Sequence, residues 1–174
     1  MRKLILYIAS SIDGYIAGPN GEIDWLFADQ DYSYNEFISS IDTVLVGRKT
    51  YDDAIKMGGD DLFPGKVTYV FTSTPHKYRP KENLVFISEN PAELWKWLRE
   101  KDGGNTWLVG GGDLIKPFLE ENIIDEYVIA FHPIILGTGI PLFKKFDGKI
   151  KLKTKDVKTF DSGLVQIFFE PVRN

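Results

Sequence analysis

Cysteine is absent from the sequence. Its absence excludes disulfide bonds, catalysis by a thiolate and zinc sites built on sulfur ligands, and it fits a reducing compartment. Histidine is nearly as rare, because His76 and His132 are the only two. Each stands next to a proline, far from the other in sequence and without the spacing of metal ligands. We therefore expect no metal site.

The sequence also lacks long apolar stretches and long runs of one charge. Nothing approaches the ~18 consecutive apolar residues of a membrane span. The apolar run at residues 4–9 is shorter than the ~7–15 residues of a signal-peptide core, and Asp13 follows soon after it. With a net charge of −4, the chain lacks the concentrated Lys and Arg of a nucleic-acid binder. We expect a cytoplasmic protein that acts on a small molecule, with no nucleic-acid or membrane partner.

The residues that are present predict a globular domain. Hydrophobic residues make up 43% of the 174 positions and aromatic residues 14%, a composition that argues against disorder. The length lies within the range of one domain and is enough to bury a sizeable core. Because no linker, repeat or low-complexity segment interrupts the chain, we expect residues 1–174 to form a single domain.

Short apolar runs alternate with helical patterns, which predicts an α/β sheet. The early runs are almost continuously apolar, as is typical of parallel strands covered on both faces. The last two alternate and flank Asp161, Ser162 and Gly163, a sequence suited to a hairpin turn, so they are expected as an antiparallel pair at one edge. The expected strands are residues 3–9, 43–46, 67–71, 84–87, 106–109, 127–131, 151–158 and 164–170.

Two helices are predicted from the residues at their N-termini. Asn90 is a suitable N-cap, and Pro91 is a suitable first helical residue. The second helix contains Pro117, which a helix tolerates only in its first turn. That helix is therefore expected to begin near Gly112 or Asp113.

Three consecutive glycines, Gly110, Gly111 and Gly112, separate the expected strand at residues 106–109 from this helix. Each glycine loses more conformational entropy on folding than other residues, so three indicate a very sharp turn or the close approach of a ligand. A helix N-terminus after a glycine cluster commonly binds an anion. Ile115 stands where the dinucleotide fingerprint needs glycine, and no Gly-Lys-Ser/Thr sequence occurs. A tight turn under close packing remains the alternative.

Two more strand ends carry groups suited to phosphate. After residues 43–46 come a glycine, two cations and a hydroxyl at the start of a helical stretch, namely Gly47, Arg48, Lys49 and Thr50. After residues 67–71 come three hydroxyls, namely Thr72, Ser73 and Thr74. Taken singly, these are solvated cations and a turn before a proline. Three polar strand ends together predict a dinucleotide site at the carboxyl edge of the sheet.

Five segments occur in the order and spacing of a known family: SSIDGYIAG, VGRKTY, VFTSTP, LVGGGDLI and HPIILGTGIPLF. On these segments the chain resembles the dihydrofolate reductase superfamily, most closely the C-terminal reductase domain of the bacterial riboflavin-biosynthesis deaminase–reductase. The likeness covers nearly the whole chain. It implies a mixed, mostly parallel eight-stranded sheet with helices on both faces and a C-terminal antiparallel hairpin. Because the zinc-binding deaminase domain is absent, it implies a stand-alone reductase, often a homodimer in this branch.

The resemblance further implies NADPH as cofactor and assigns residues to it. Ala9 and Ile16 would lie beside the nicotinamide. The segment 47–50 would hold the adenosine and pyrophosphate side, and Ser73, with Thr72, the 2′-phosphate region. The three glycines would meet the pyrophosphate, with a cis peptide between the first two.

Two positions depart from the family pattern. Asp113 stands where dihydrofolate reductases often have a basic residue, and it either repels a 2′-phosphate or caps the following helix. This acid leaves the preference for NADPH over NADH open. Tyr7 stands where the riboflavin-pathway reductases usually have lysine.

In dihydrofolate reductases the proton donor lies near the start of the first helix, after a tryptophan. Asp29 is the preferred candidate here, and Asp31 and Asp24 are the alternatives around Trp25. A simple acidic cluster that favours the helix dipole is equally compatible.

We predict an NADPH-dependent reductase that transfers hydride to a C=N or C=O group of a small heterocyclic or sugar-linked substrate. The reference activity is reduction of 5-amino-6-(5-phosphoribosylamino)uracil. A dihydrofolate or pteridine reductase and a non-catalytic nucleotide-binding protein are the alternatives.

Overall fold

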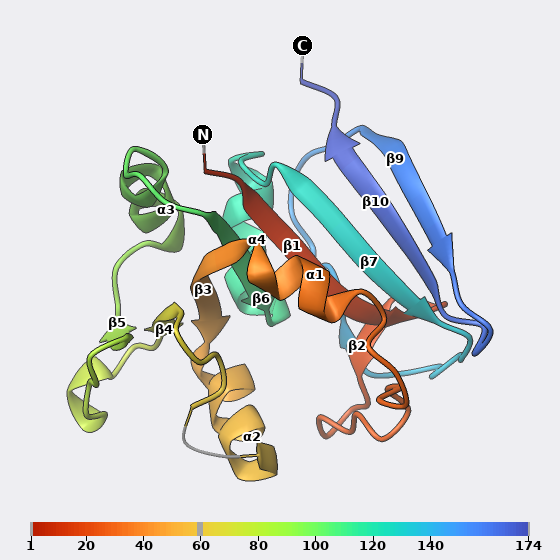
Figure 1. Ribbon diagram of the computed structural model, residues 1–174, viewed down its shortest axis with the longest axis horizontal. Helices are drawn as coiled ribbons and strands as arrows, with labels where there is room; N and C mark the ends of the chain where they lie inside the picture. Colours follow the sequence, from red (N-terminus) through yellow and green to blue (C-terminus); the bar gives the residue numbers. More distant parts are fainter. Residues whose placement is uncertain (1, 59–60, 174) are drawn as a thin grey trace.

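The computed structural model describes residues 2–58 and 61–173 of the chain (Figure 1). In chain order its elements are β1 (Leu4–Ser11), β2 (Tyr15–Ala17), α1 (Tyr34–Ser39), β3 (Ile41–Gly47), α2 (Arg48–Gly58), β4 (Val67–Phe71), the 3₁₀ turn η1 (Pro75–Lys77), β5 (Leu84–Ile87), α3 (Pro91–Arg99), β6 (Asn105–Gly110), α4 (Gly112–Glu120), β7 (Glu126–His132), β8 (Ile140–Pro141), β9 (Leu152–Thr159) and β10 (Val165–Pro171).

An eight-stranded sheet organises these elements, in the order β5-β4-β3-β6-β1-β7-β10-β9. Within the run β5-β4-β3-β6-β1-β7, each strand is parallel to the next one in the sheet. β10 is antiparallel to β7, and β9 is antiparallel to β10. The predicted mixed, mostly parallel sheet with a C-terminal hairpin is thereby confirmed. Gly163, with φ +87°, makes the hairpin turn between β9 and β10.

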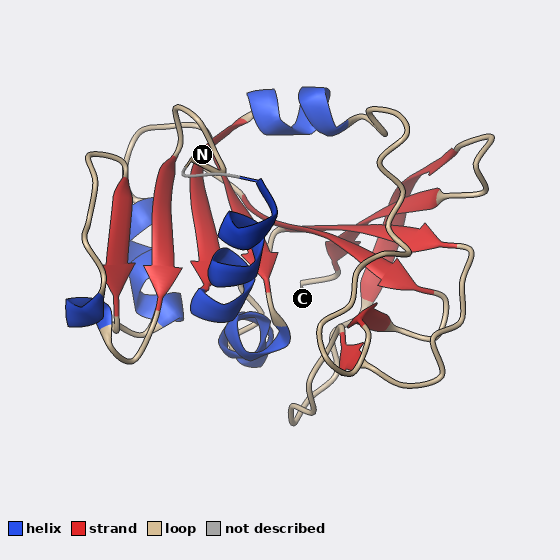
Figure 2. Cartoon of the chain, turned by 90° about the horizontal axis from the view of Figure 1, so that it is seen from below, coloured by secondary structure: helices blue, strands red, loops and turns tan. Residues whose placement is uncertain are grey.

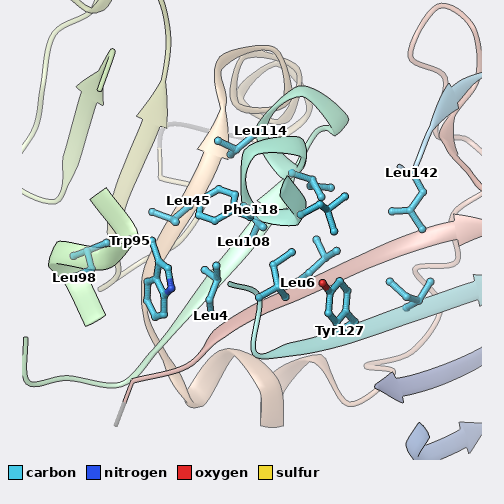
Figure 3. Close-up of a cluster of buried hydrophobic side chains, with 14 residues drawn as sticks. Leu4, Leu6, Leu45, Trp95, Leu98, Leu108, Leu114, Phe118, Tyr127 and Leu142 are labelled. Carbon is cyan, nitrogen blue, oxygen red and sulfur yellow. The ribbon is translucent and has the colours of Figure 1, made fainter. Parts of the chain in front are cut away.

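Helices cover both faces of the sheet, as the near-continuous apolar strands predict (Figure 2). Successive strand residues point to opposite faces. Leu4 and Leu6 belong to the larger core, which packs against α3 and α4 (Figure 3). Ile5 and Trp107 belong to the second core, together with Phe37 of α1.

The predicted starts of α3 and α4 are confirmed, and the expectation for Pro117 is corrected. The Asn90 side chain accepts hydrogen bonds from the backbone N–H groups of Ala92 and Glu93, at 2.9 and 3.3 Å, and so caps α3. Helix α4 begins at Gly112, as expected. Pro117 nevertheless lies beyond the first turn of α4. The buried apolar face of α4 outweighs the one intrahelical hydrogen bond that proline removes.

A second, two-stranded sheet of β2 and β8 was not predicted. Strands of three and two residues are too short to show an alternating pattern. No helix within the described ranges 2–58 and 61–173 has the length and apolar character that crossing a membrane requires.

Candidate functional site

The three polar strand ends meet at one edge of the sheet. β4, β3 and β6 are consecutive parallel strands, so their carboxyl ends lie side by side. Gly47 at the end of β3 is in register with Phe71, the last residue of β4. On the other side, Val46 is in register with Gly110, the last residue of β6. The fold therefore brings together the segments 47–50, 72–74 and 110–112, as the sequence predicts.

The backbone is closely packed where β3 and β6 end. A Cβ atom at Gly47 would lie 3.4 Å from the carbonyl oxygen of Gly110. The Gly111 N–H donates a hydrogen bond to Oγ1 of Thr50 in α2, at 3.3 Å. The Gly110–Gly111 peptide is cis, as the resemblance implies. Helices α2 and α4 thus begin next to each other, with the glycine turn between them.

Each of the three glycines meets a different requirement. Gly110 has φ +112°, and a Cβ there would lie 3.3 Å from side-chain carbons of Ile8 and Ile115. At Gly112 a Cβ would lie 3.2 Å from a carbon of Lys144. Gly111 has φ −54°, and its Cβ would meet only Thr50 Oγ1, at 3.4 Å. Packing and turn geometry therefore account for Gly110 and Gly112, whereas Gly111 borders open space.

This open space, which we call the glycine cradle, has the properties of an anion site. It lies at the N-termini of α2 and α4, where the helix dipoles favour negative charge. No side chain caps the N-terminus of α4. Backbone N–H groups at such a terminus lack intrahelical partners and are available to a bound anion. The cradle therefore fits the pyrophosphate of a dinucleotide.

Two cations near the cradle, Arg48 and Lys144, form ion pairs with acids. Arg48 donates a 2.6 Å hydrogen bond to Oδ2 of Asp52, one turn further along α2. This bond, together with one to Tyr78, raises the pKa of Arg48. Asp113 forms an ion pair with Lys144, so it does not present an isolated negative charge beside the glycines.

The remaining predicted cofactor residues divide by exposure. Lys49 and Ser73 are exposed. Thr72 is buried, and its Oγ1 accepts a hydrogen bond from the Thr74 N–H at 3.2 Å. Ser73 is therefore the hydroxyl of this pair that a ligand can reach directly.

A cavity of about 580 Å³ lies beside β1. Ile8 of β1 lines this cavity and also lies against Gly110. Ala9, predicted to lie beside the nicotinamide, lines the cavity as well. Ile16 does not line it and packs against the larger core instead. The other walls are largely aromatic, from Tyr7, Phe27, Tyr32, Tyr34 and Trp107.

A buried glutamine organises one wall of the cavity. Gln166 of β10 is 1% exposed, and its Nε2 donates to the Tyr7 hydroxyl at 2.9 Å and to the Tyr32 carbonyl oxygen at 2.8 Å. Burial raises the pKa of Tyr7, more than the bond from Gln166 lowers it. Tyr7 is therefore a neutral phenol at pH 7. Since its oxygen accepts from Gln166, its own O–H can donate to a ligand in the cavity.

His132 holds the loop at residues 26–28, which also lines the cavity. Its Nε2 accepts from the Phe27 N–H at 3.2 Å, which places the ring proton on Nδ1, 3.2 Å from the Ala130 carbonyl oxygen. Burial lowers the pKa of His132, with a smaller opposing effect from Ala130. Within the described part of the chain, no cluster of three or more potential ligands could hold a metal.

The candidate acids lie in different places. Asp31 lines the cavity, and one of its oxygens accepts a hydrogen bond from the Asn35 N–H at 3.0 Å. Asp29 does not line it; its carboxylate accepts a 2.6 Å hydrogen bond from the Tyr32 hydroxyl. Asp24 is exposed and also lies outside the lining. The geometry favours Asp31 over the residue preferred from sequence.

The family model described as the RibD C-terminal domain matches residues 2–166. The chain belongs to the RibD C-terminal domain family. An uncharacterized protein of Bacillus subtilis (strain 168), YwjB, is 39% identical over 162 residues, which cover 91% of this chain and 92% of that protein.

Solved structures of similar proteins agree with this assignment. A putative riboflavin biosynthesis protein from Shewanella sp. PV-4 shares 28% identity at a TM-score of 0.84, covering 98% of this chain and 99% of that one. The Thermotoga maritima diaminohydroxyphosphoribosylaminopyrimidine deaminase/5-amino-6-(5-phosphoribosylamino)uracil reductase shares 19% identity at 0.74, covering 98% of this chain and 57% of that one. Enterococcus faecalis dihydrofolate reductase, complexed with NADP(H), shares 20% identity at a TM-score of 0.71, covering 97% of this chain and 96% of that one. The last two show the fold alone.

In this RibD C-terminal domain family member, sequence reasoning missed most of the cavity wall. Tyr7 stood out only as a departure from the family pattern, and nothing marked Tyr34 or Trp107. Gln166 offered the best signal, because it is a polar residue at an inward position of an alternating strand. A buried polar side chain needs partners, and such a residue is a candidate for a site.

His132 predicts a pH dependence of stability. Because its folded pKa lies below the unfolded value of 6.5, the unfolded chain binds more protons as the pH falls below 6.5. The stability that neutral His132 contributes is therefore present above pH 6.5 and is lost as the pH falls through its folded pKa. We expect the thermal midpoint of the wild type to fall between pH 7.5 and 5.5 by a few degrees more than that of His132→Gln. His76→Gln, at an exposed histidine, is the control and should behave as wild type. An equal fall of the thermal midpoint in the wild type and in His132→Gln would contradict a lowered pKa of His132 in the folded protein.

Proposed function

We propose that residues 1–174 form one NADPH-dependent reductase domain that transfers hydride to a C=N or C=O group of a small heterocyclic or sugar-linked substrate. The reference activity is the uracil reduction named for the Thermotoga maritima relative. One observation carries the proposal: β1 connects a glycine cradle between two helix N-termini with a 580 Å³ aromatic cavity, because Ile8 lines the cavity and also lies next to Gly110. The NADP(H) complex of a dihydrofolate reductase with this fold supports the choice of cofactor.

The residues present fit NADPH in three regions. The glycine cradle, with Gly111 at its open side, would hold the pyrophosphate. Arg48 and Ser73, at the ends of β3 and β4, would hold the 2′-phosphate side. The ion pair of Asp113 with Lys144 reduces the repulsion that an acid there would otherwise exert. Ala9, which lines the cavity, would lie beside the nicotinamide.

Bound NADPH would supply the hydride, and the chain would supply the surroundings that the transfer needs. The aromatic walls exclude water and offer flat surfaces to a ring. The Tyr7 O–H can donate a hydrogen bond to an acceptor atom of the substrate. Asp31, an exposed carboxylate at the cavity wall, would take up a proton from solvent and relay it to the reduced atom.

Cofactor binding is the first test. Gly111→Ala places a methyl group in the cradle, whereas the protein itself offers only Thr50 Oγ1 near that position. We expect NADPH affinity to fall at least tenfold in a fluorescence titration, and further in Gly111→Val. The thermal midpoint should change little, because φ at Gly111 suits any residue. Gly58→Ala, at the open end of α2, is the matched control and should bind as wild type. Unchanged affinity in both Gly111 variants would mean that the glycines serve packing only.

Cofactor preference is the second test. Replacing Arg48 with Gln removes a charge-assisted hydrogen bond to the 2′-phosphate, which corresponds to roughly a tenfold or greater loss in affinity. We expect that loss for NADPH and almost none for NADH, measured as dissociation constants. Lys56→Gln removes a cation that pairs with Asp53 near the far end of the same helix, and it should alter neither constant. Equal losses for both cofactors would remove Arg48 from the 2′-phosphate site.

The proton donor is tested by a matched pair of acids. We expect Asp31→Asn to reduce kcat for NADPH oxidation by about 100-fold, within the usual range for loss of a general acid. Asp29→Asn should retain turnover within twofold, because Asp29 lies outside the cavity lining. Neither change should alter NADPH affinity. The reverse result would return the role to Asp29, and full NADPH binding without turnover of any substrate would favour a non-catalytic nucleotide-binding protein.

A further inference from the structure

The cavity carries no positive charge on its lining. Of the described residues that line it, none is lysine or arginine, and Asp31 alone is an acid. His132 also lines the cavity, but both of its ring nitrogens are engaged and burial lowers its pKa. The wall therefore presents one carboxylate and otherwise aromatic, aliphatic and neutral polar groups.

Three cations on neighbouring elements, Lys158, Arg48 and Lys144, contact other polar or acidic groups. Lys158 of β9 is in register with Gln166, but its Nζ lies 3.3 Å from Ser33 Oγ and 3.4 Å from Glu36 Oε2. At the glycine cradle, Arg48 and Lys144 pair with acids of their own and would be used by the cofactor phosphates. A phosphate on the substrate would thus meet Asp31 without a compensating cation on the cavity wall.

The same wall suits a flat, uncharged ring. Tyr7 and Trp107 lie with ring centroids 6.3 Å apart, and Tyr34 packs edge-to-face on Trp107 at 5.9 Å. The Tyr7 O–H offers one hydrogen bond donor, fixed in place by Gln166. A planar nitrogen heterocycle with an acceptor atom at its edge satisfies these groups, and burying it costs much less than burying a phosphate dianion.

We propose that the cavity takes an uncharged planar nitrogen heterocycle without a phosphate group, and that it discriminates against the phosphorylated form of the same molecule. This substrate class rests on the proposed function, because it makes the cavity the substrate half of a reductase. It differs from the reference activity, whose substrate carries a phosphoribosyl group. Tyr7 is the residue that binds the edge of the ring, and Asp31 is the residue that repels the phosphate.

Two pairs of probes that differ only by a phosphate test the proposal. They are 5-amino-6-(ribosylamino)uracil with its 5′-phosphate, and riboflavin with its 5′-phosphate. Each is titrated by calorimetry into the NADP⁺-saturated protein and into the protein alone. We expect at least one unphosphorylated probe to bind, and its phosphate to bind about tenfold more weakly, as expected for a dianion several ångströms from one carboxylate.

Variants separate the two parts of the proposal. Gln30→Lys adds a cation at an exposed position of the lining and should bring the two affinities of a pair to within about twofold. Asp31→Asn should reduce the difference in affinity within a pair. It should do so by strengthening binding of the phosphorylated probe, with binding of the unphosphorylated probe unchanged. Tyr7→Phe removes only the hydroxyl and should weaken the unphosphorylated probe about fivefold, with the NADP⁺ dissociation constant unchanged.

The possible outcomes distinguish this proposal from the proposed function. If a phosphorylated probe binds as tightly as its partner, or if neither unphosphorylated probe binds, the substrate class is overturned even where NADP⁺ binds. If an unphosphorylated probe binds preferentially and NADP⁺ does not bind, the cavity assignment stands and the reductase function fails.

Discussion

The site depends on the close approach of β3 and β6 where the two strands end. A Cβ at Gly47 would be in van der Waals contact with the Gly110 carbonyl oxygen, at 3.4 Å, so little room is left between the strands there. Gly110 has φ +112°, which strongly favours glycine. Because the strands end together, α2 and α4 start together, and the Gly111 N–H can reach Thr50 Oγ1. Two helix dipoles then act on the same small volume. The proposed anion site therefore depends on the close approach of two strand ends and on backbone groups rather than on cationic side chains.

β1 connects this anion site with the cavity. As the central strand next to β6 and β7, it has one face towards α4 and the other towards α1. Ile8 lies against Gly110, whereas Tyr7, its neighbour on the opposite face, receives the hydrogen bond from Gln166. A one-residue shift of β1 would exchange the two faces and remove both contacts. The register of β1 against β7, seven residue pairs from Ile5–Glu126 to Ser11–His132, therefore stabilises both halves of the site at once.

The features of the fold that depend on neighbouring residues were predictable from the sequence. The eight main strands, the cap at Asn90 and the start of α4 were all predicted because turn residues and apolar periodicity act within a few positions. The meeting of the three polar strand ends was also predictable, since parallel strands share a carboxyl edge. The cavity was not predictable from the sequence, because Tyr7, Trp107 and Gln166 lie more than fifty residues apart along the chain. The order of the strands in the sheet brings them together. For a related reason the sequence does not show that Asp31 lines the cavity and Asp29 does not, because two carboxylates two residues apart differ in where an irregular loop directs them.

The two halves of the site differ in charge, and this difference bears on how the family fold can serve different substrates. The glycine cradle would bind phosphate mainly through backbone groups, which any sequence with the same strand ends retains. The cavity wall is made of side chains from separate elements, so its charge can change one residue at a time without disturbing the sheet. A cationic residue at the position of Tyr7 would provide a counter-charge for an anionic substrate, whereas the phenol held by Gln166 offers a single neutral donor. Under the proposed function, the backbone of the fold would therefore determine cofactor binding, and a few replaceable side chains would determine which substrate charge is accepted.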